Sequence, residues 1–195
     1  MLVLALILAA GVLAGYAFGG RLRHLSTVRV RWWWLAPIAL GIQALPAPAL
    51  PGTRADLLGV GLLLGSFGLL LVLAAANVRQ PGFALMLVGV AMNLVVIAAN
   101  RGMPVSASAL RKAGAAESVA ELRGAEGKHH LATGDDVLVP LTDVIPVPGL
   151  RVVLSAGDVV AYGGVAVFVA WAMRRPARRG RSRAPRRARR SGTRR

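Results

Sequence analysis

The sequence contains no cysteine and few acidic residues. Among its 195 residues, 8 are Asp or Glu and 24 are Lys or Arg, which gives a formal net charge of +16. Without thiols the chain forms no disulfide and no thiolate metal site. Only 16% of the residues are charged and 55% are hydrophobic, whereas soluble domains are about 25% charged. This composition argues against a soluble globular enzyme.

Long uncharged runs are the main positive feature of the chain. A helix needs about 20 apolar residues to cross the hydrocarbon core of a membrane. Such runs predict an all-α polytopic integral membrane bundle of five transmembrane helices, at residues 1–20, 32–50, 57–77, 81–100 and 152–173. The second is the weakest, because Pro46, Pro48 and Pro51 end it early; a re-entrant segment is the alternative there.

The distribution of basic residues predicts an orientation. Five spans put the loop with Arg21, Arg23, Arg29 and Arg31, the turn with Arg79, and residues 174–195 on one side, without any acid. The positive-inside rule makes that side cytoplasmic and the N-terminus external. The uncharged N-terminal run follows no basic residue, so it is not read as a secretory signal. We expect a multi-pass protein of a bacterial plasma membrane.

Residues 174–195 form an arginine-rich segment with 12 arginines among Ala, Ser, Gly and Pro. Such a composition cannot bury apolar surface, so a disordered cytoplasmic tail is predicted. Contact with anionic lipid is the favoured interpretation. Nucleic-acid binding is the weaker alternative, because no aromatic residue is interleaved for base stacking.

Residues 101–151 are the only long polar segment and predict a small external cap between the fourth and fifth helices. Ser106 is placed as the N-cap of a helix that runs to Ala113 and stops at Gly114. A second short helix is expected over 117–123. Residues 129–131 and 137–141 are expected to form a hairpin across a turn at 133–136, and residues 145–149 an extended connector.

Two glycine repeats suggest close helix packing. Gly11, Gly15 and Gly19 recur every four residues in the first helix, as do Gly61 and Gly65 in the third. Small residues at this spacing let membrane helices approach closely. They would also permit a homo-oligomer.

Each polar residue inside the apolar runs can be interpreted in two ways, as a structural group or as a functional one. Asn93 and Asn100 share one helical face and form either interhelical hydrogen bonds or the wall of an outward-opening polar cavity. Ser155 and Asp158 fit a capping box at the start of the last helix, and they also share a face with Tyr162 at the membrane mouth. Arg101, Lys128 and Arg151 are the expected external partners of Asp158.

Several short motifs resemble one protein family. They are Asn100-Arg101-Gly102-Met103-Pro104-Val105, Lys128-His129, Leu141-x-Asp143-x-Ile145-Pro146 and Ser155-x-Gly157-Asp158. Together they resemble the bacterial membrane-protein family called domain of unknown function 5317 (DUF5317), over about residues 1–173. The resemblance implies membrane location and carries no activity. In the pattern it implies, position 101 is commonly glycine.

The candidate functional residues all map to the predicted outer face. They are Asn93, Asn100, Arg101, Lys128, His129, Asp143, Ser155 and Asp158. We expect a non-enzymatic scaffold or partner-binding protein, with a membrane-protein partner or a second copy of the chain as its partner. One alternative is a small transporter or channel lined by Asn93, Asn100 and Asp158.

A further alternative is an outer-surface enzyme that acts on a lipid or envelope precursor through His129, Asp143 and Asp158. No complete catalytic motif supports it. The adjacent His129 and His130 diverge too far to share one metal. No metal and no cofactor is therefore expected.

Overall fold

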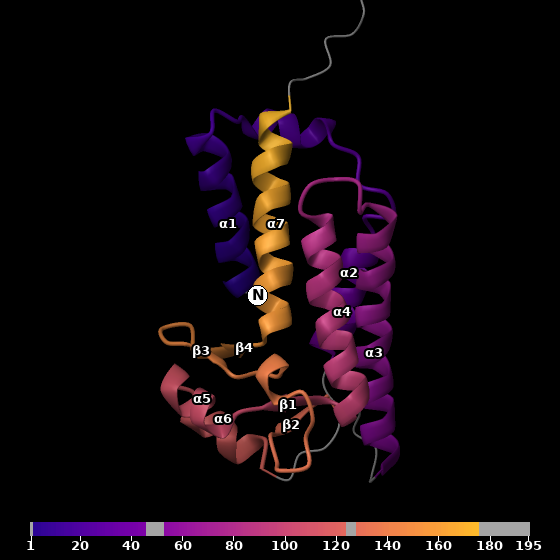
Figure 1. Cartoon of the computed structure of the whole chain (residues 1–195), viewed down its shortest axis with the longest axis vertical. Helices are drawn as coiled ribbons and strands as arrows, with labels where there is room; N and C mark the ends of the chain where they lie inside the picture. The colour runs from indigo at the N-terminus through magenta and orange to yellow at the C-terminus, as the bar shows by residue number, and fades with distance from the viewer. Residues whose placement is uncertain (1, 46–52, 124–127, 176–195) are drawn as a thin grey trace, which may run out of the picture.

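Long apolar helices stand side by side in the computed structural model, and short strands and helices gather at one end of them (Figure 1). The structure describes residues 2–45, 53–123 and 128–175. The bundle helices are α1 (Leu2–Ala17), α2 (Leu35–Ala44), α3 (Thr53–Ala76), α4 (Phe83–Asn100) and α7 (Ala156–Arg174). A short 3-10 helix, η1 (Leu22–Thr27), follows α1. The chain is therefore mostly helical.

Three helices are long and apolar enough to cross a membrane, namely α3 over Leu57–Ala76, α4 and α7. The helix α2 is shorter than the predicted second span over 32–50, because it has 10 residues, about 15 Å at 1.5 Å per residue, against a hydrocarbon core of about 30 Å. α1 has 16 residues and is also shorter than its predicted 20. Pro46, Pro48 and Pro51 lie outside the described residues.

Bundle helices that follow one another along the chain run in opposite directions, so that the first and the last run the same way. α1 runs parallel to α7, because Gly11 lies against Ala166 and Gly15 lies against Met173. α4 packs against both α7 and α3. Figure 1 shows η1, the α3–α4 turn and the C-terminal end of α7 at one end of the bundle, and the short strands at the other. The basic loop and turn of the sequence therefore share one end.

Glycines allow α4 and α7 to touch backbone to backbone. A Cβ at Gly89 would collide with the Gly157 carbonyl, and one at Gly164 would lie 2.6 Å from the Gly82 oxygen. The packing predicted for α1 is present at Gly11 and Gly15. The packing predicted for Gly61 and Gly65 is not found within the molecule, because no described atom lies within 4 Å of an added Cβ there.

Much of the helix surface is apolar and exposed. Leu13 is 69% exposed on α1 and Leu57 is 71% exposed on α3. Only 28–33% of the three candidate spans is buried inside the molecule. Helices that are apolar all round, yet open on their outer faces, are suited to a lipid surround.

The cap consists of short elements between α4 and α7. They are β1 (Met103–Val105), α5 (Ala107–Ala113), α6 (Ala116–Glu121), β2 (His129–Leu131), η2 (Val139–Leu141), β3 (Ile145–Val147) and β4 (Val152–Leu154). As predicted, the Ser106 hydroxyl accepts from the Ala109 N–H, and Gly114 ends α5 with a φ of 81°. Val105, Leu110, Ala115 and Val119 form the core of the cap.

The strand pairing corrects the sequence expectation. β2 pairs in parallel with β1 rather than with residues 137–141, which contain η2 instead of a strand. The expected connector at 145–149 contains β3, which pairs antiparallel with β4. The extended conformation of residues 129–131 could be predicted from their types. Their partner strand could not, because it depends on how α5 and α6 fold the chain back onto β1. The cap therefore contains short strands, as the expected hairpin implied, but their pairing differs.

Candidate functional site

Asn93, Ser155 and Asp158 form one hydrogen-bonded network between α4 and α7. The Asn93 amide nitrogen donates to Asp158 Oδ1 at 2.7 Å, and Ser155 Oγ donates to Asn93 Oδ1 at 2.8 Å. The predicted capping box is confirmed, because the Asp158 N–H donates to Ser155 Oγ and the Ser155 N–H donates to Asp158 Oδ2. Asn93 and Ser155 are both buried.

This network explains the tight approach of the two helices. Gly157 follows the capping serine, and a Cβ there would collide with Asn93 Oδ1. Asp158 takes Asn93 as its partner, whereas the expected partner Arg151 pairs with Glu117. Both the nitrogen and the oxygen of the Asn93 side-chain amide are thus hydrogen-bonded, as buried polar groups require.

Asn100 and Lys128 fasten the cap to the bundle. The Asn100 side chain accepts from the Val137 N–H at 2.8 Å and donates to the Val137 carbonyl at 3.0 Å. The Lys128 Nζ donates to the carbonyls of Ile42, Gln43 and Leu45 at 3.1, 3.3 and 2.7 Å. These carbonyls lie at the C-terminal end of α2, where a cation is favoured.

Arg101 ends α4 in the left-handed conformation. Its φ is 55°, and its N–H donates to the Ile97 carbonyl. Glycine is the residue that adopts this conformation without steric cost. The structure thus gives a physical reason for glycine at this position, and the exposed arginine side chain has no part in it.

Asp143 differs from these residues, because its carboxyl is buried and makes no hydrogen bond within the described part of the chain. The residue is 9% exposed, and its Oδ1 is fully buried without a partner. Its backbone is fixed, because its N–H donates to the Pro104 carbonyl and its carbonyl accepts from the Ser106 N–H. Burial, and then the charge of Asp158, raise the pKa of Asp143 to about 8. The carboxyl is therefore largely protonated at pH 7.

Asp143 lines a hollow of about 300 Å³ in the cap. Its walls come from β1, α5, α6, β2 and β4, and they are lined by Val105, Leu110, Ser118, Glu121, Leu122, His129, Asp143, Val152 and Val153. Volumes of about 300–1,000 Å³ are usual for small-molecule sites. A mostly apolar wall with a few polar groups is also typical of such sites.

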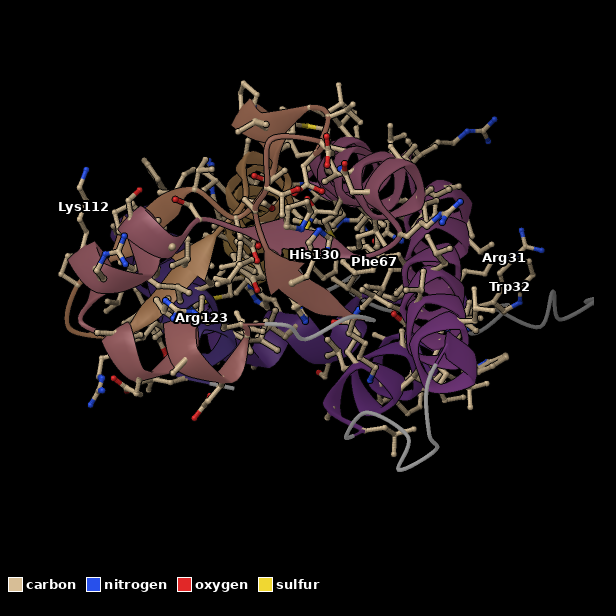
Figure 2. All side chains as sticks on the ribbon, turned by 90° about the horizontal axis from the view of Figure 1, so that it is seen from below. Arg31, Trp32, Phe67, Lys112, Arg123 and His130 are labelled. Carbon is tan, nitrogen blue, oxygen red and sulfur yellow. The ribbon has the colours of Figure 1, made fainter. Side chains whose placement is uncertain are left out.

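His129 also lines this hollow. Burial of its imidazole, and then the Lys128 charge, lower the pKa of His129 from its ordinary value, although the residue as a whole is exposed. Its neighbour His130 points elsewhere and lies 3.0 Å from Asp136 Oδ1. Figure 2 shows the cap end with His130 near the middle of this face and Lys112 at its rim.

Seven of the eight candidate residues therefore fall into three groups. Asn93, Ser155 and Asp158 join two helices, Asn100 and Lys128 hold the cap, and Asp143 and His129 face a hollow. Arg101 ends α4 through its backbone conformation. Within the described ranges no three His, Asp or Glu side chains gather in a geometry that could hold a metal ion.

The sequence reasoning missed the walls of the hollow. Leu110, Leu122 and Val153 are ordinary apolar residues of short elements, and no spacing rule brings them to one cavity. It also missed the paired glycines Gly82 and Gly89 on α4 and Gly157 and Gly164 on α7. Each pair is seven residues apart, a recognisable packing signal.

Comparison with known proteins gives one match. Residues 27–170 match the sequence model of a family described as a family of unknown function, DUF5317. The match bears out the resemblance seen in the sequence and leaves α1 outside it. No curated protein and no solved structure matches the chain.

Proposed function

Because the chain belongs to the DUF5317 family of unknown function, we propose its function from the geometry of the cap. We propose an integral membrane protein that spans the bacterial plasma membrane five times and carries an external, partner-binding cap. The N-terminus is outside, and the arginine-rich C-terminal tail is cytoplasmic. The tail contacts anionic lipid.

Two observations support the membrane topology. α3, α4 and α7 have the length and hydropathy of spans. The alternating directions of the helices bring η1, the Arg79 turn and the end of α7 to one end of the bundle (Figure 1). In the proposal, α1 and α2 cross a thinner part of the bilayer or reach its interface through flanking residues, as short spans do.

The unbonded carboxyl of Asp143 carries the proposed binding role. A buried polar group without a partner destabilises a fold. Such a group, in a cavity and with a shifted pKa, is a candidate for contact with a ligand. We infer that a partner places a hydrogen-bonding group against Asp143 and an apolar group against Leu110, Leu122 and Val153.

The transporter alternative loses its main support. Asn93 and Asp158 are bonded to each other, and Ser155 completes the set. A polar route needs groups that are free to exchange water or ions, whereas these act as links between helices. The enzyme alternative retains Asp143 and His129 at one hollow, whereas its third residue, Asp158, is bonded to Asn93 between α4 and α7.

Site-specific photocross-linking in living cells tests the binding role. A photoreactive amino acid replaces Leu122 at the hollow, and a control chain carries it at the exposed Lys112 of α5. The proposal predicts a covalent adduct of defined mass from position 122 that disappears when Asp143→Asn is added. An adduct that forms equally from position 112, or one that survives Asp143→Asn, would reject Asp143 as the binding group.

A further inference from the structure

A second hollow lies at the other end of the bundle, away from the cap. Its volume is about 430 Å³, and it is formed by the C-terminal turn of α3 and the chain that leads into α2. Its lining residues are Arg31, Ala75, Ala76, Asn77, Val78, Arg79 and Gln80. Two arginines therefore line a hollow at the end of a candidate membrane span.

Buried Asn77 holds the backbone of Arg31 in place. The Arg31 N–H donates to Asn77 Oδ1 at 2.8 Å, and Asn77 Nδ2 donates to the carbonyls of Arg31 and Leu73, both at 2.8 Å. Gln80 adds a bond from its amide nitrogen to the Arg29 carbonyl at 3.1 Å. The backbone of Arg31 is thus fixed to the end of α3 by side chains distant in sequence.

Within the described part of the chain, no acidic side chain neutralises these arginines. The chain has no Asp or Glu in residues 1–55 or 57–116. Among the described residues neither Arg31 nor Arg79 belongs to an ion pair. Their guanidinium groups are therefore available to an anion, and guanidinium binds phosphate oxygens through paired hydrogen bonds.

The surroundings of the hollow fit a membrane interface. The Arg31 guanidinium lies 4.6 Å from the Trp32 ring centre, and Figure 2 shows both side chains next to each other at the edge of the molecule. Trp33 and Trp34 are 66% and 49% exposed. Tryptophan prefers the headgroup level of a bilayer, where lipid phosphates lie. Exposed Val78 adds an apolar rim.

We propose that this hollow binds the phosphate of an anionic phospholipid between Arg31 and Arg79. The site is separate from the arginine-rich tail and independent of the Asp143 hollow. It rests on α3 and α4 spanning the membrane. A bound headgroup would fix the end of α3 at the interface.

Native mass spectrometry of the full-length protein in detergent tests this site. The protein is titrated with phosphatidylglycerol or with phosphatidylcholine, and the bound lipid is counted. The double variant Arg31→Gln, Arg79→Gln is expected to bind phosphatidylglycerol about twentyfold more weakly, since each arginine near an anionic headgroup contributes roughly fivefold. Binding of phosphatidylcholine should not change.

A matched control removes two charges from the cap instead. Arg111→Gln with Lys112→Gln leaves the tail and the hollow intact, and it should change phosphatidylglycerol binding less than about twofold because neither residue lines the site. A charge-preserving pair, Arg31→Lys with Arg79→Lys, keeps both charges but loses the paired hydrogen bonds of guanidinium, so it should bind phosphatidylglycerol more weakly than the wild type and more strongly than the Gln pair. Binding of phosphatidylglycerol by the Lys pair would show that the Gln pair loses binding because its charges are removed and not because it fails to fold.

Three outcomes would overturn the proposal. The first is full phosphatidylglycerol binding by the Arg31→Gln, Arg79→Gln variant, which would assign the lipid to the tail. The second is equal loss in the cap control. The third is displacement of the lipid by millimolar inorganic phosphate, which would make the hollow a site for free phosphate.

Discussion

At the scale of single residues, Asp143 connects the chemistry of the cap to its stability. Its pKa rises from 3.8 to about 8 in the folded protein, first through burial and then through the charge of Asp158. Between these values the unfolded chain has lost the proton and the folded chain keeps it. The folded state therefore loses stability as the pH rises through this range.

We predict that the free energy of unfolding falls between about pH 4 and pH 8, and that Asp143→Asn removes this component. The comparison between the wild type and Asp143→Asn isolates it, because His129 and Glu121 at the same hollow remain in both proteins. Chemical unfolding in detergent at several pH values measures it. A difference in stability that stays constant with pH would show that Asp143 is ionised in the fold.

Arg101 shows how far a single residue can be interpreted from sequence. The family pattern pointed to a glycine position, and the left-handed φ of 55° explains why. Arginine at such a position costs about 1–2 kcal/mol. The partners of Lys128 were beyond sequence reasoning, because the end of α2 lies more than 80 residues away in the chain.

At the scale of elements, the contact between α4 and α7 organises the membrane part. Gly89 and Gly157 allow the backbones to touch, and Asn93 bonds across the same point. Packing and one polar link therefore act together at the cap end of these helices. Polar links of this kind contribute about 0.6 kcal/mol on average, so the close packing carries most of the stability.

Replacing Gly157 by alanine should separate this contact from general helix stability. The added methyl group collides with Asn93 Oδ1 and the Gly89 carbonyl, so we predict a loss of about 1–3 kcal/mol. Gly163→Ala is the matched control on the same helix, because nothing lies within 4 Å of its added Cβ. Thermal unfolding in detergent compares them, and equal melting temperatures would refute the proposed contact.

Sequence patterns located the elements better than their partners. Helical runs around α3, α4 and α7 followed from uncharged length, and the caps at Ser106 and Ser155 followed from residue type. The length of α2 did not follow from the sequence, because the apolar residues 32–34 lie before the helix. Trp32, the first of them, has a left-handed φ of 56°. The pairing of β2 with β1 depends on tertiary folding, which period-2 patterns do not encode.

At the scale of the whole molecule, the two ends of the bundle differ in chemistry. One end carries arginines and tryptophans without acids in the chain segments that form it, and the other carries the cap with Asp143 and His129. This asymmetry supports the proposed orientation under the positive-inside rule. It also separates the two proposed sites, one for a partner outside and one for a lipid phosphate inside.

Cysteine labelling in intact cells tests this orientation most directly, because the natural chain has no cysteine. Ser108→Cys places a thiol on exposed α5 of the cap, and Ser26→Cys places one on exposed η1 at the opposite end. With a membrane-impermeant maleimide, we predict labelling at position 108 in intact cells and labelling at position 26 only after the cells are permeabilised. Labelling of position 26 in intact cells, with position 108 protected, would contradict the account.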